Sequence, residues 1–147
     1  GKPFKIRNQI GNSGVIAVFN IDAENRTVRG TVSPTDAGLP VGDYGYYEQF
    51  TGEWGLLHSG ESLPVTLVNN DVYRLFRIEL HHDLLGRLDL FMGVGAVKDV
   101  DAEGVTFYEG GKVGFLVDRR DGKKPYFYSS TLPEKKNARV LFSSVIK

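Results

Sequence analysis

Val15-Ile16-Ala17-Val18-Phe19, residues 15–19, and Phe76-Arg77-Ile78-Glu79-Leu80, residues 76–80, are the two stretches that decide the fold. The first is apolar on both faces of an extended chain, which is typical of a central strand covered above and below. The second alternates apolar and charged side chains, and we expect it to form a strand with one face open to solvent. Both stretches predict an all-β protein.

Similar strand signals recur along the chain between short turns rich in Gly, Asn and Asp. The predicted strands occupy residues 15–21, 27–32, 44–50, 53–58, 63–68, 72–80, 88–92, 105–108, 113–117, 126–128 and 140–146. Residues 83–92 also fit a helical stripe, although Gly86 interrupts it, and we favour a strand from the neighbouring pattern. This strand content predicts an antiparallel two-sheet β-sandwich of the Greek-key type, continuous as a single domain over residues 1–147.

The best-defined local feature is a predicted β-hairpin with the two-residue turn Thr51-Gly52. In that register Gln49 faces Trp54 across the hairpin. Alternation then divides the side chains into two sets, one with Tyr44, Tyr46, Glu48 and Phe50, the other with Tyr47, Gln49, Trp54 and Leu56. We expect one aromatic set to line the core and the other to face solvent.

The composition is that of an ordinary globular domain, with 41% hydrophobic and 24% charged residues in a chain of 147. No apolar run is long enough to predict a membrane span. The 18 basic and 18 acidic residues give zero net charge, which argues against a nucleic-acid partner because phosphate binding needs clustered positive charge. The sequence has no cysteine, so disulfides and thiolate chemistry are excluded. The cytoplasm is the default expectation for localisation.

Three acidic residues resemble the beginning of a calcium-binding loop. Asp99, Asp101 and Glu103 alternate before Gly104, as the first carboxylates of such a loop do. The twelfth position is Gly110 instead of the bidentate Glu, and the flanking residues read as strands rather than helices. An acidic turn between strands is therefore favoured over a metal site.

The histidines offer a second candidate for a metal or a general base. His81 and His82 precede Asp83, but adjacent residues on a strand point to opposite faces and do not chelate one ion. His58 belongs to another predicted strand. We expect exposed histidines at a strand end, with no metal and no cofactor.

Other catalytic motifs are incomplete or missing. Gly93-Val94-Gly95 begins like a dinucleotide fingerprint, yet Lys98 stands at the third glycine position. No Gly-x-Ser-x-Gly elbow for an acyl nucleophile occurs. The residues alone therefore assign no catalytic group.

The aromatic residues of the hairpin are a better candidate for ligand binding. Sugars present apolar C–H faces that stack on Trp or Tyr while polar neighbours bind their hydroxyls. Trp54, Tyr46 and Tyr47 are the predicted sugar platform on this ground. The alternative is that these rings fill a core, which is the commoner use of aromatic residues on strands.

A family resemblance extends over nearly the whole chain. Its motifs are short segments in a fixed order, namely Lys5-Ile6-Arg7-Asn8, Gly14-Val15-Ile16-Ala17-Val18-Phe19-Asn20, Ser62-Leu63-Pro64-Val65-Thr66-Leu67, Val72-Tyr73-Arg74-Leu75-Phe76, residues 88–97, and residues 126–136 with Tyr128-Ser129-Ser130 and Pro133. In that order they resemble the C-terminal region of the raffinose synthase, stachyose synthase and alkaline α-galactosidase group, within family thirty-six of the glycoside hydrolases. Arg7, where the group has Trp, is one of the departures that indicate a distant relative.

The resemblance implies an accessory role. The group keeps its catalytic aspartates on a (β/α)-barrel upstream of this region, so no catalytic residue is carried over and the chain itself is expected not to be an enzyme. Because the first residue is Gly1 rather than Met, we expect the chain to be part of a longer one. The resemblance implies that this longer chain is a glycosidase or galactosyl-transferring enzyme, of which residues 1–147 are the C-terminal domain. Its expected partner is the upstream barrel, with a galactoside as a possible ligand. The alternative hypothesis is an autonomous carbohydrate-binding module.

Overall fold

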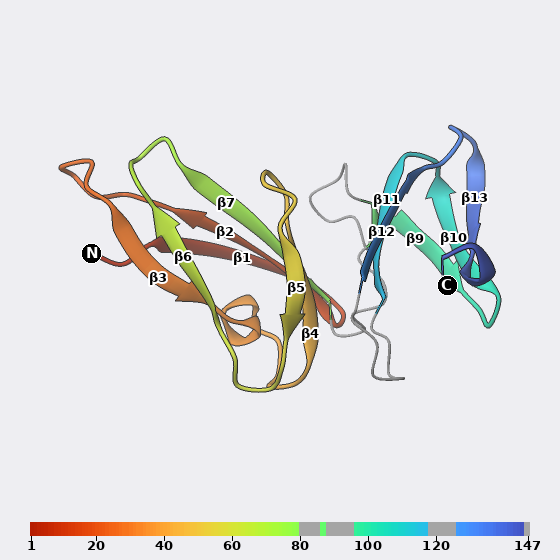
Figure 1. The fold of residues 1–147 in the computed structure, drawn as a ribbon, viewed down its shortest axis with the longest axis horizontal. Helices are drawn as coiled ribbons and strands as arrows, with labels where there is room; N and C mark the ends of the chain where they lie inside the picture. The colour runs from red at the N-terminus through yellow and green to blue at the C-terminus, as the bar shows by residue number, and fades with distance from the viewer. Residues whose placement is uncertain (80–85, 88–95, 118–125, 146–147) are drawn as a thin grey trace. The chain divides into compact units, whose positions relative to one another are not determined.

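The computed structural model describes residues 1–79, 86–87, 96–117 and 126–145, and these residues form antiparallel β-sheets without an α-helix. The all-β prediction is therefore confirmed. The chain divides into two compact units, Gly1–His81 and His82–Lys147 (Figure 1). The Greek-key connections and the single domain over residues 1–147 stay predictions.

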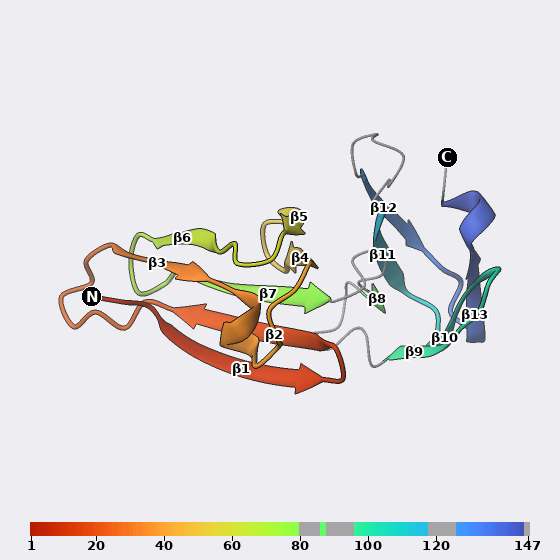
Figure 2. The same cartoon turned by 90° about the horizontal axis from the view of Figure 1, so that it is seen from below.

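The first unit is built from two sheets. Its described elements are β1 (Phe4–Ile10), β2 (Ser13–Phe19), β3 (Val28–Val32), the 3-10 helix η1 (Pro34–Ala37), β4 (Tyr44–Glu48), β5 (Trp54–Leu57), β6 (Leu63–Leu67) and β7 (Tyr73–Glu79). Five strands form one sheet in the order β1-β2-β7-β4-β5, and β3 pairs with β6 in a second sheet. Figure 2 shows the two sheets as two layers.

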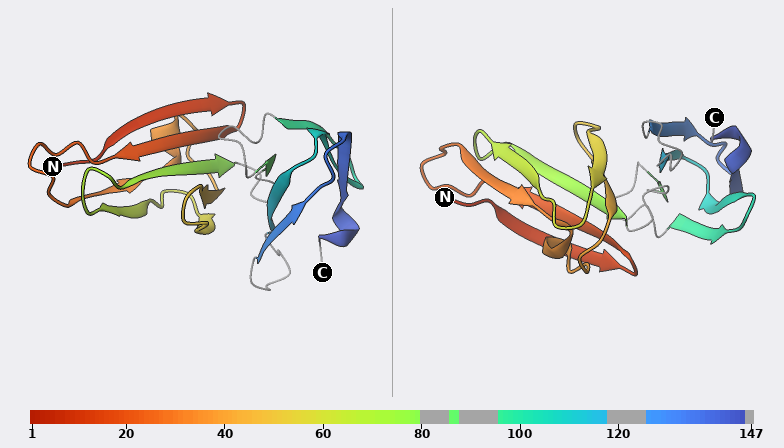
Figure 3. Two further views of the ribbon diagram at one scale, coloured as in Figure 1. Left: turned by 90° about the horizontal axis from the view of Figure 1, so that it is seen from above. Right: turned by 60° about the horizontal axis from the view of Figure 1, so that its bottom comes forward.

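The core of the first unit lies between these two layers. The five-stranded sheet contributes Ile16, Val18, Tyr44, Tyr46, Leu57, Phe76 and Ile78, and the two-stranded sheet contributes Val32, Val65 and Leu67. Helix η1 lies beside β1 and β2 (Figure 3), and its residue Ala37 belongs to the same core. Side chains from facing sheets that share one core define a β-sandwich.

The two stretches that decide the fold are neighbours in the five-stranded sheet. β2 pairs with β7 along its whole length, from Ser13 opposite Glu79 to Phe19 opposite Tyr73. Val15 is also buried, as expected for a strand covered on both faces. The expectation that the charged face of β7 is open to solvent is wrong at Arg77 and Glu79, which are only 4% and 7% exposed, although Tyr73 at the start of the same face is exposed. Alternation marks the two faces of a strand, but it does not reveal how far the neighbouring strands shield each of them.

The hairpin of β4 and β5 forms, but its predicted register is wrong. Trp54 lies opposite Tyr47, two residues earlier than Gln49. The connection is longer than two residues because the Glu48 carboxylate accepts hydrogen bonds from the N–H groups of Phe50 and Thr51, at 3.0 and 2.5 Å. Gly52 completes the turn with φ +74°, a conformation that glycine adopts readily. A shift of two residues leaves the side chains of the paired strands on their predicted faces. Phe50 is the exception, because it lies in the turn and meets Tyr73 instead of joining Tyr44 and Tyr46 in the core.

The second unit also contains two described sheets. Its elements are β8 (Gly86–Arg87), β9 (Val97–Val100), β10 (Gly104–Glu109), β11 (Lys112–Val117), β12 (Tyr126–Thr131), β13 (Lys136–Leu141) and the 3-10 helix η3 (Phe142–Ser144). The sheet orders are β13-β10-β9 and β12-β11-β8. The core of this unit joins Val105 and Phe107 from β10 with Val113 and Phe115 from β11 and with Val140 from β13.

Several elements differ from their predictions. The strands β1 and β9 were not predicted, and the last predicted strand, 140–146, begins earlier, at Lys136, and gives way to η3 after Leu141. Of the ambiguous segment 83–92, the structure describes only Gly86 and Arg87, which form β8, and the rest lies outside the described residues. In the described part of the chain no helix has the length and hydropathy that a membrane crossing requires.

Candidate binding surface on the five-stranded sheet

The strand order brings four aromatic residues into one row on the outer face of the five-stranded sheet, the face turned away from β3 and β6. Phe4 on β1 lies opposite Phe19 on β2, which lies opposite Tyr73 on β7. The rings of Phe19 and Tyr73 stack with centroids 6.0 Å apart, and Phe50, just beyond β4, meets Tyr73 edge-on at 5.0 Å. We call Phe4, Phe19, Tyr73 and Phe50 the aromatic row.

An aliphatic row follows next to the aromatic row. Ile6 lies opposite Ala17, and Ala17 lies opposite Leu75. Together the two rows leave four large apolar side chains open to solvent, with exposed fractions of 48% for Phe4, 53% for Ile6, 51% for Phe50 and 48% for Tyr73. Scattered exposed apolar residues are normal on a protein surface, but a contiguous group of them marks an interaction site.

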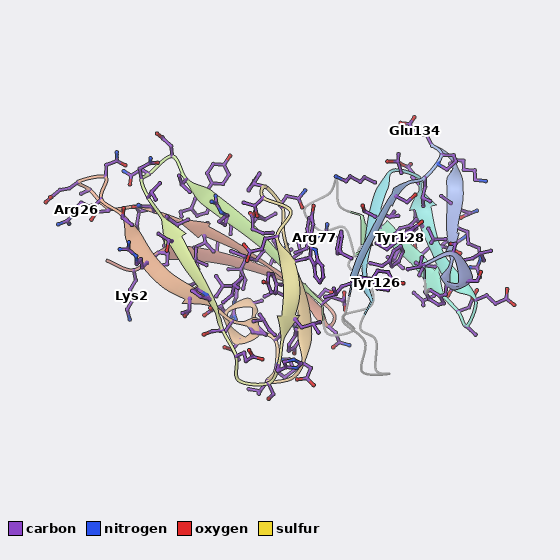
Figure 4. All side chains as sticks on the ribbon, in the orientation of Figure 1. Lys2, Arg26, Arg77, Tyr126, Tyr128 and Glu134 are labelled. Atoms are coloured by element: carbon purple, nitrogen blue, oxygen red, sulfur yellow. The ribbon has the colours of Figure 1, made fainter. Side chains whose placement is uncertain are left out.

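The rest of this outer face is buried or hydrogen-bonded rather than apolar and exposed. Farther along β7, Arg77 lies opposite Val15 on one side and Tyr47 on the other, and all three are buried. Beyond them the Ser13 hydroxyl donates a hydrogen bond to the carboxylate of Glu79. Figure 4 shows Arg77 at the opposite end of the sheet from Lys2, which lies two residues before the start of β1. Exposed apolar surface is therefore concentrated at the end of the sheet where β1 begins.

The predicted sugar platform is divided between the two faces of the sheet. Tyr46 belongs to the core, where its ring meets Phe76 edge-on at 6.5 Å and burial raises the pKa of its phenol. Tyr47 and Trp54 are cross-strand neighbours on the outer face. The structure thus brings Tyr47 and Trp54 together and places Tyr46 on the other side, because adjacent residues of a strand point in opposite directions.

The predicted calcium loop is a turn closed by an ion pair. Asp101 Oδ1 accepts hydrogen bonds from the backbone N–H groups of Glu103 and Gly104, at 2.8 and 3.0 Å. Arg139 Nη2 donates to Oδ1 and Oδ2 of Asp101 at 2.8 and 2.9 Å, and chiefly this interaction lowers the pKa of the Asp101 carboxyl from 3.8 to about 2. Asp99 lies on β9, and Asp99 and Glu103 are both exposed.

The remaining metal candidates do not form a site in the described structure. His81, His82 and Asp83 lie outside the described residues. His58 is exposed, with Nδ1 at 3.9 Å from Asp43 Oδ1. Within the residues that are described, no group of three His, Cys, Asp or Glu side chains is placed to hold a metal ion.

An open cleft of about 450 Å³ lies in the second unit, at the turn that joins β12 to β13. It is lined by Glu109, Gly110, Glu134, Lys135 and Lys136, and Figure 4 shows Glu134 on this turn. The backbone approaches closely here, since a Cβ on Gly110 would fall 1.7 Å from the Pro133 carbonyl oxygen. The four charged side chains are exposed and of both signs. They do not form a preorganised site for one class of ligand.

Sequence reasoning missed the aromatic row. Phe4 belongs to a strand outside the predicted set, and nothing in the local sequence distinguishes Tyr73 and Phe19 from other strand residues. The row consists of apolar residues on the same side of three neighbouring strands, so it can be recognised only when the order of the strands is known. No family model matches the chain, and no characterised protein matches its sequence. The fold and this surface are therefore the observations that bear on function.

Proposed function

We propose that the chain is a non-catalytic accessory β-domain that packs against a larger partner domain through the outer face of its five-stranded sheet. The partner in this proposal is the catalytic (β/α)-barrel of an α-galactosidase or raffinose-synthase-like enzyme, which the order of the short sequence motifs suggests. The observation that carries the proposal is the exposed aromatic row.

The energy of burial supports this use of the row. Complete burial of a Phe side chain contributes about 1.5–3 kcal/mol, so a ring that is half exposed retains roughly half of that contribution for a partner. Phe4, Phe50 and Tyr73 are each about half exposed, and Ile6 lies beside them. An apolar flank of a second domain that covered these side chains would gain the remaining free energy of their burial.

The contacts of the buried acidic side chains fit a structural role. Glu48 is fully buried, and its carboxylate accepts hydrogen bonds from the backbone N–H groups of Phe50, Thr51 and Leu75. Glu79 accepts a hydrogen bond from Ser13. A carboxylate bound to several backbone donors stabilises a loop, whereas a general acid must keep an exchangeable proton near its substrate.

Two measurements test the proposal. Purified chain incubated with a chromogenic α-galactoside is expected to show no turnover above a buffer control. The reading frame upstream of Gly1 is expected to encode a (β/α)-barrel that carries two catalytic aspartates. Sustained hydrolysis by the purified chain, or an upstream region of another class, would contradict the proposal.

A second candidate function is carbohydrate binding, for which the partly exposed ring of Trp54 on the outer face, beside the buried Tyr47, is the candidate stacking surface. Titration calorimetry with galactose, melibiose and raffinose tests it directly. Saturable binding that disappears in Trp54→Ala, while far-UV circular dichroism stays unchanged, would support this function. The absence of binding to all three sugars would contradict carbohydrate binding, and domain docking would remain as the proposed function.

A further inference from the structure

We propose that a second copy of this chain covers the aromatic row wherever no larger partner does so. Two five-stranded sheets would then pack outer face to outer face in a weak symmetric dimer. This goes beyond the accessory role, since it concerns what the chain does in the absence of a barrel.

The charge of the surface permits such self-association. The two rows consist of Phe4, Ile6, Ala17, Phe19, Phe50, Tyr73 and Leu75, and the phenol of Tyr73 is the one ionisable group among these side chains. The whole chain has 18 basic and 18 acidic residues and hence no net charge. Two copies therefore experience no net long-range repulsion, and no like charges meet when the two rows face each other.

The symmetry of a face-to-face contact also suits a second copy. A two-fold interface uses the same patch on both molecules, so an apolar row meets an apolar row of equal length. Within a β-sandwich two antiparallel sheets pack through their inner faces with strands nearly aligned, and the proposed contact uses the same geometry between two outer faces. An apolar patch on an unrelated protein would have to match this row by chance, whereas the second copy carries the same row.

Pairing along the β1 edge, which carries Phe4 and Ile6 of the two rows, is disfavoured, and this directs association there to the face. β1 is one of the two edge strands of the sheet, β5 being the other, and its residues Lys5 and Arg7 alternate with Phe4 and Ile6, so they point to the inner side. Lys5 Nζ is held there by Asp36 Oδ2 of η1 at 2.9 Å. Inward-pointing charged residues on an edge strand are a recognised protection against edge-to-edge pairing.

The available area predicts that the dimer is weak. A fully buried aromatic side chain removes roughly 150–250 Å² from solvent. Because Phe4, Phe50, Tyr73 and Ile6 are each about half exposed, they offer on the order of 400 Å² per copy, about half of a standard interface. We therefore expect a weak, transient dimer, and displacement of the second copy by any partner with a larger apolar surface.

Sedimentation equilibrium of the purified chain over a range of concentrations tests the dimer, with Tyr73→Ser as the variant and Tyr108→Ser as the matched control. Tyr108 is an exposed tyrosine on β10, at 55% compared with 48% for Tyr73. We expect Tyr73→Ser to weaken dimerisation by at least about tenfold, as loss of a central interface aromatic does, and Tyr108→Ser to leave it unchanged. Added sodium chloride should not dissociate the dimer, because the contact between the two copies is apolar and salt screens only charges.

Folding of each variant is verified by far-UV circular dichroism and by Trp54 fluorescence. Phe50→Ser is the second variant, because Phe50 lies in a turn and its loss disturbs no strand pairing. A chain that stays monomeric at all concentrations overturns the proposal, as does a dimer that Tyr108→Ser weakens as much as Tyr73→Ser. Neither result bears on the accessory function, which is decided by the upstream reading frame and the galactosidase assay.

Discussion

The carboxylate of Glu48 joins the β4–β5 turn to strand β7 through Leu75. Glu48 Oε1 accepts a hydrogen bond from the Leu75 backbone N–H at 3.1 Å, and Oε2 accepts from Phe50 and Thr51 in the turn. The Gln49 N–H donates to the Leu75 carbonyl oxygen at 2.8 Å, which completes the connection. One buried side chain thus fixes the turn, and the turn positions Phe50 against Tyr73 in the aromatic row.

We expect Glu48→Gln to destabilise the protein by about 1–3 kcal/mol, because the amide NH2 group replaces an acceptor and leaves buried backbone donors unsatisfied. Urea denaturation followed by Trp54 fluorescence measures the loss. Glu53→Gln is the matched control, since Glu53 is exposed and its side chain accepts none of these backbone bonds. Equal effects of the two substitutions would show that the buried carboxylate does not hold the turn.

The Asp101–Arg139 pair predicts how stability depends on pH. The pKa of Asp101 is lowered from 3.8 to about 2, so its contribution is fully present above the unfolded value of 3.8 and is lost as the pH falls through about 2. We expect the urea midpoint of the wild type to fall in this window more than that of Asp101→Asn. The contribution is modest, because both side chains are partly exposed to solvent.

The control for this pair is Asp99→Asn, on the neighbouring strand β9 and outside the hydrogen bonds that Asp101 makes. Its urea midpoint should follow that of the wild type across the acid range. If Asp101→Asn and the wild type lose stability in parallel below pH 3.8, the ion pair contributes nothing to the folded state.

Gly14 is required by the close approach of η1 to β2. A Cβ added to Gly14 would lie 2.6 Å from the Cβ of Ala37, too close for two carbon atoms. We expect Gly14→Ala to cost about 1–3 kcal/mol, as overpacking does, and Gly14→Ala with Ala37→Gly to cost less than the sum of the two single substitutions. Thermal unfolding of the wild type, the two single variants and the double variant completes this double-mutant cycle. If the destabilisation of the double variant equals the sum of the two single effects, the side chains at positions 14 and 37 do not clash.

The two units each have a core of their own, and Trp54, the one tryptophan of the chain, lies in the first. Phe107 is completely buried in the core of the second unit. We expect Phe107→Ala to remove about 3–5 kcal/mol from that core and to lower the circular dichroism transition while the Trp54 fluorescence transition stays in place. Transitions that move together would instead support the single domain predicted from the sequence.

Local patterns were enough to predict much of the chain. Alternation and β-branched runs located β2, β3, β4, β6, β7, β10, β11 and β12, because these patterns follow from the period of two of an extended chain. The same reasoning failed for β1, whose sequence Phe-Lys-Ile-Arg-Asn-Gln-Ile also contains strand alternation but carries three polar residues on one side. It also failed for the hairpin register, where a side-chain cap at Glu48 lengthened the turn.

The candidate sites depended more strongly on long-range contacts. Asp101 belongs to an acidic run in the sequence, but Arg139, which neutralises it, is 38 residues away and reaches it because β13 pairs with β10. The sugar platform was divided by strand geometry, with Tyr46 in the core and Tyr47 beside Trp54. Sequence spacing alone does not report which side chain on another strand meets a given residue.

The sequence by itself determined that this chain is a β protein of ordinary composition, since strand propensity and alternation are local properties of the residues. The tertiary structure decided that Phe4, Phe19, Tyr73 and Phe50 form one exposed row. The physical reason is that the order β1-β2-β7-β4 is fixed by packing and hydrogen bonding between distant segments, and only that order places residues from four parts of the chain on the same surface.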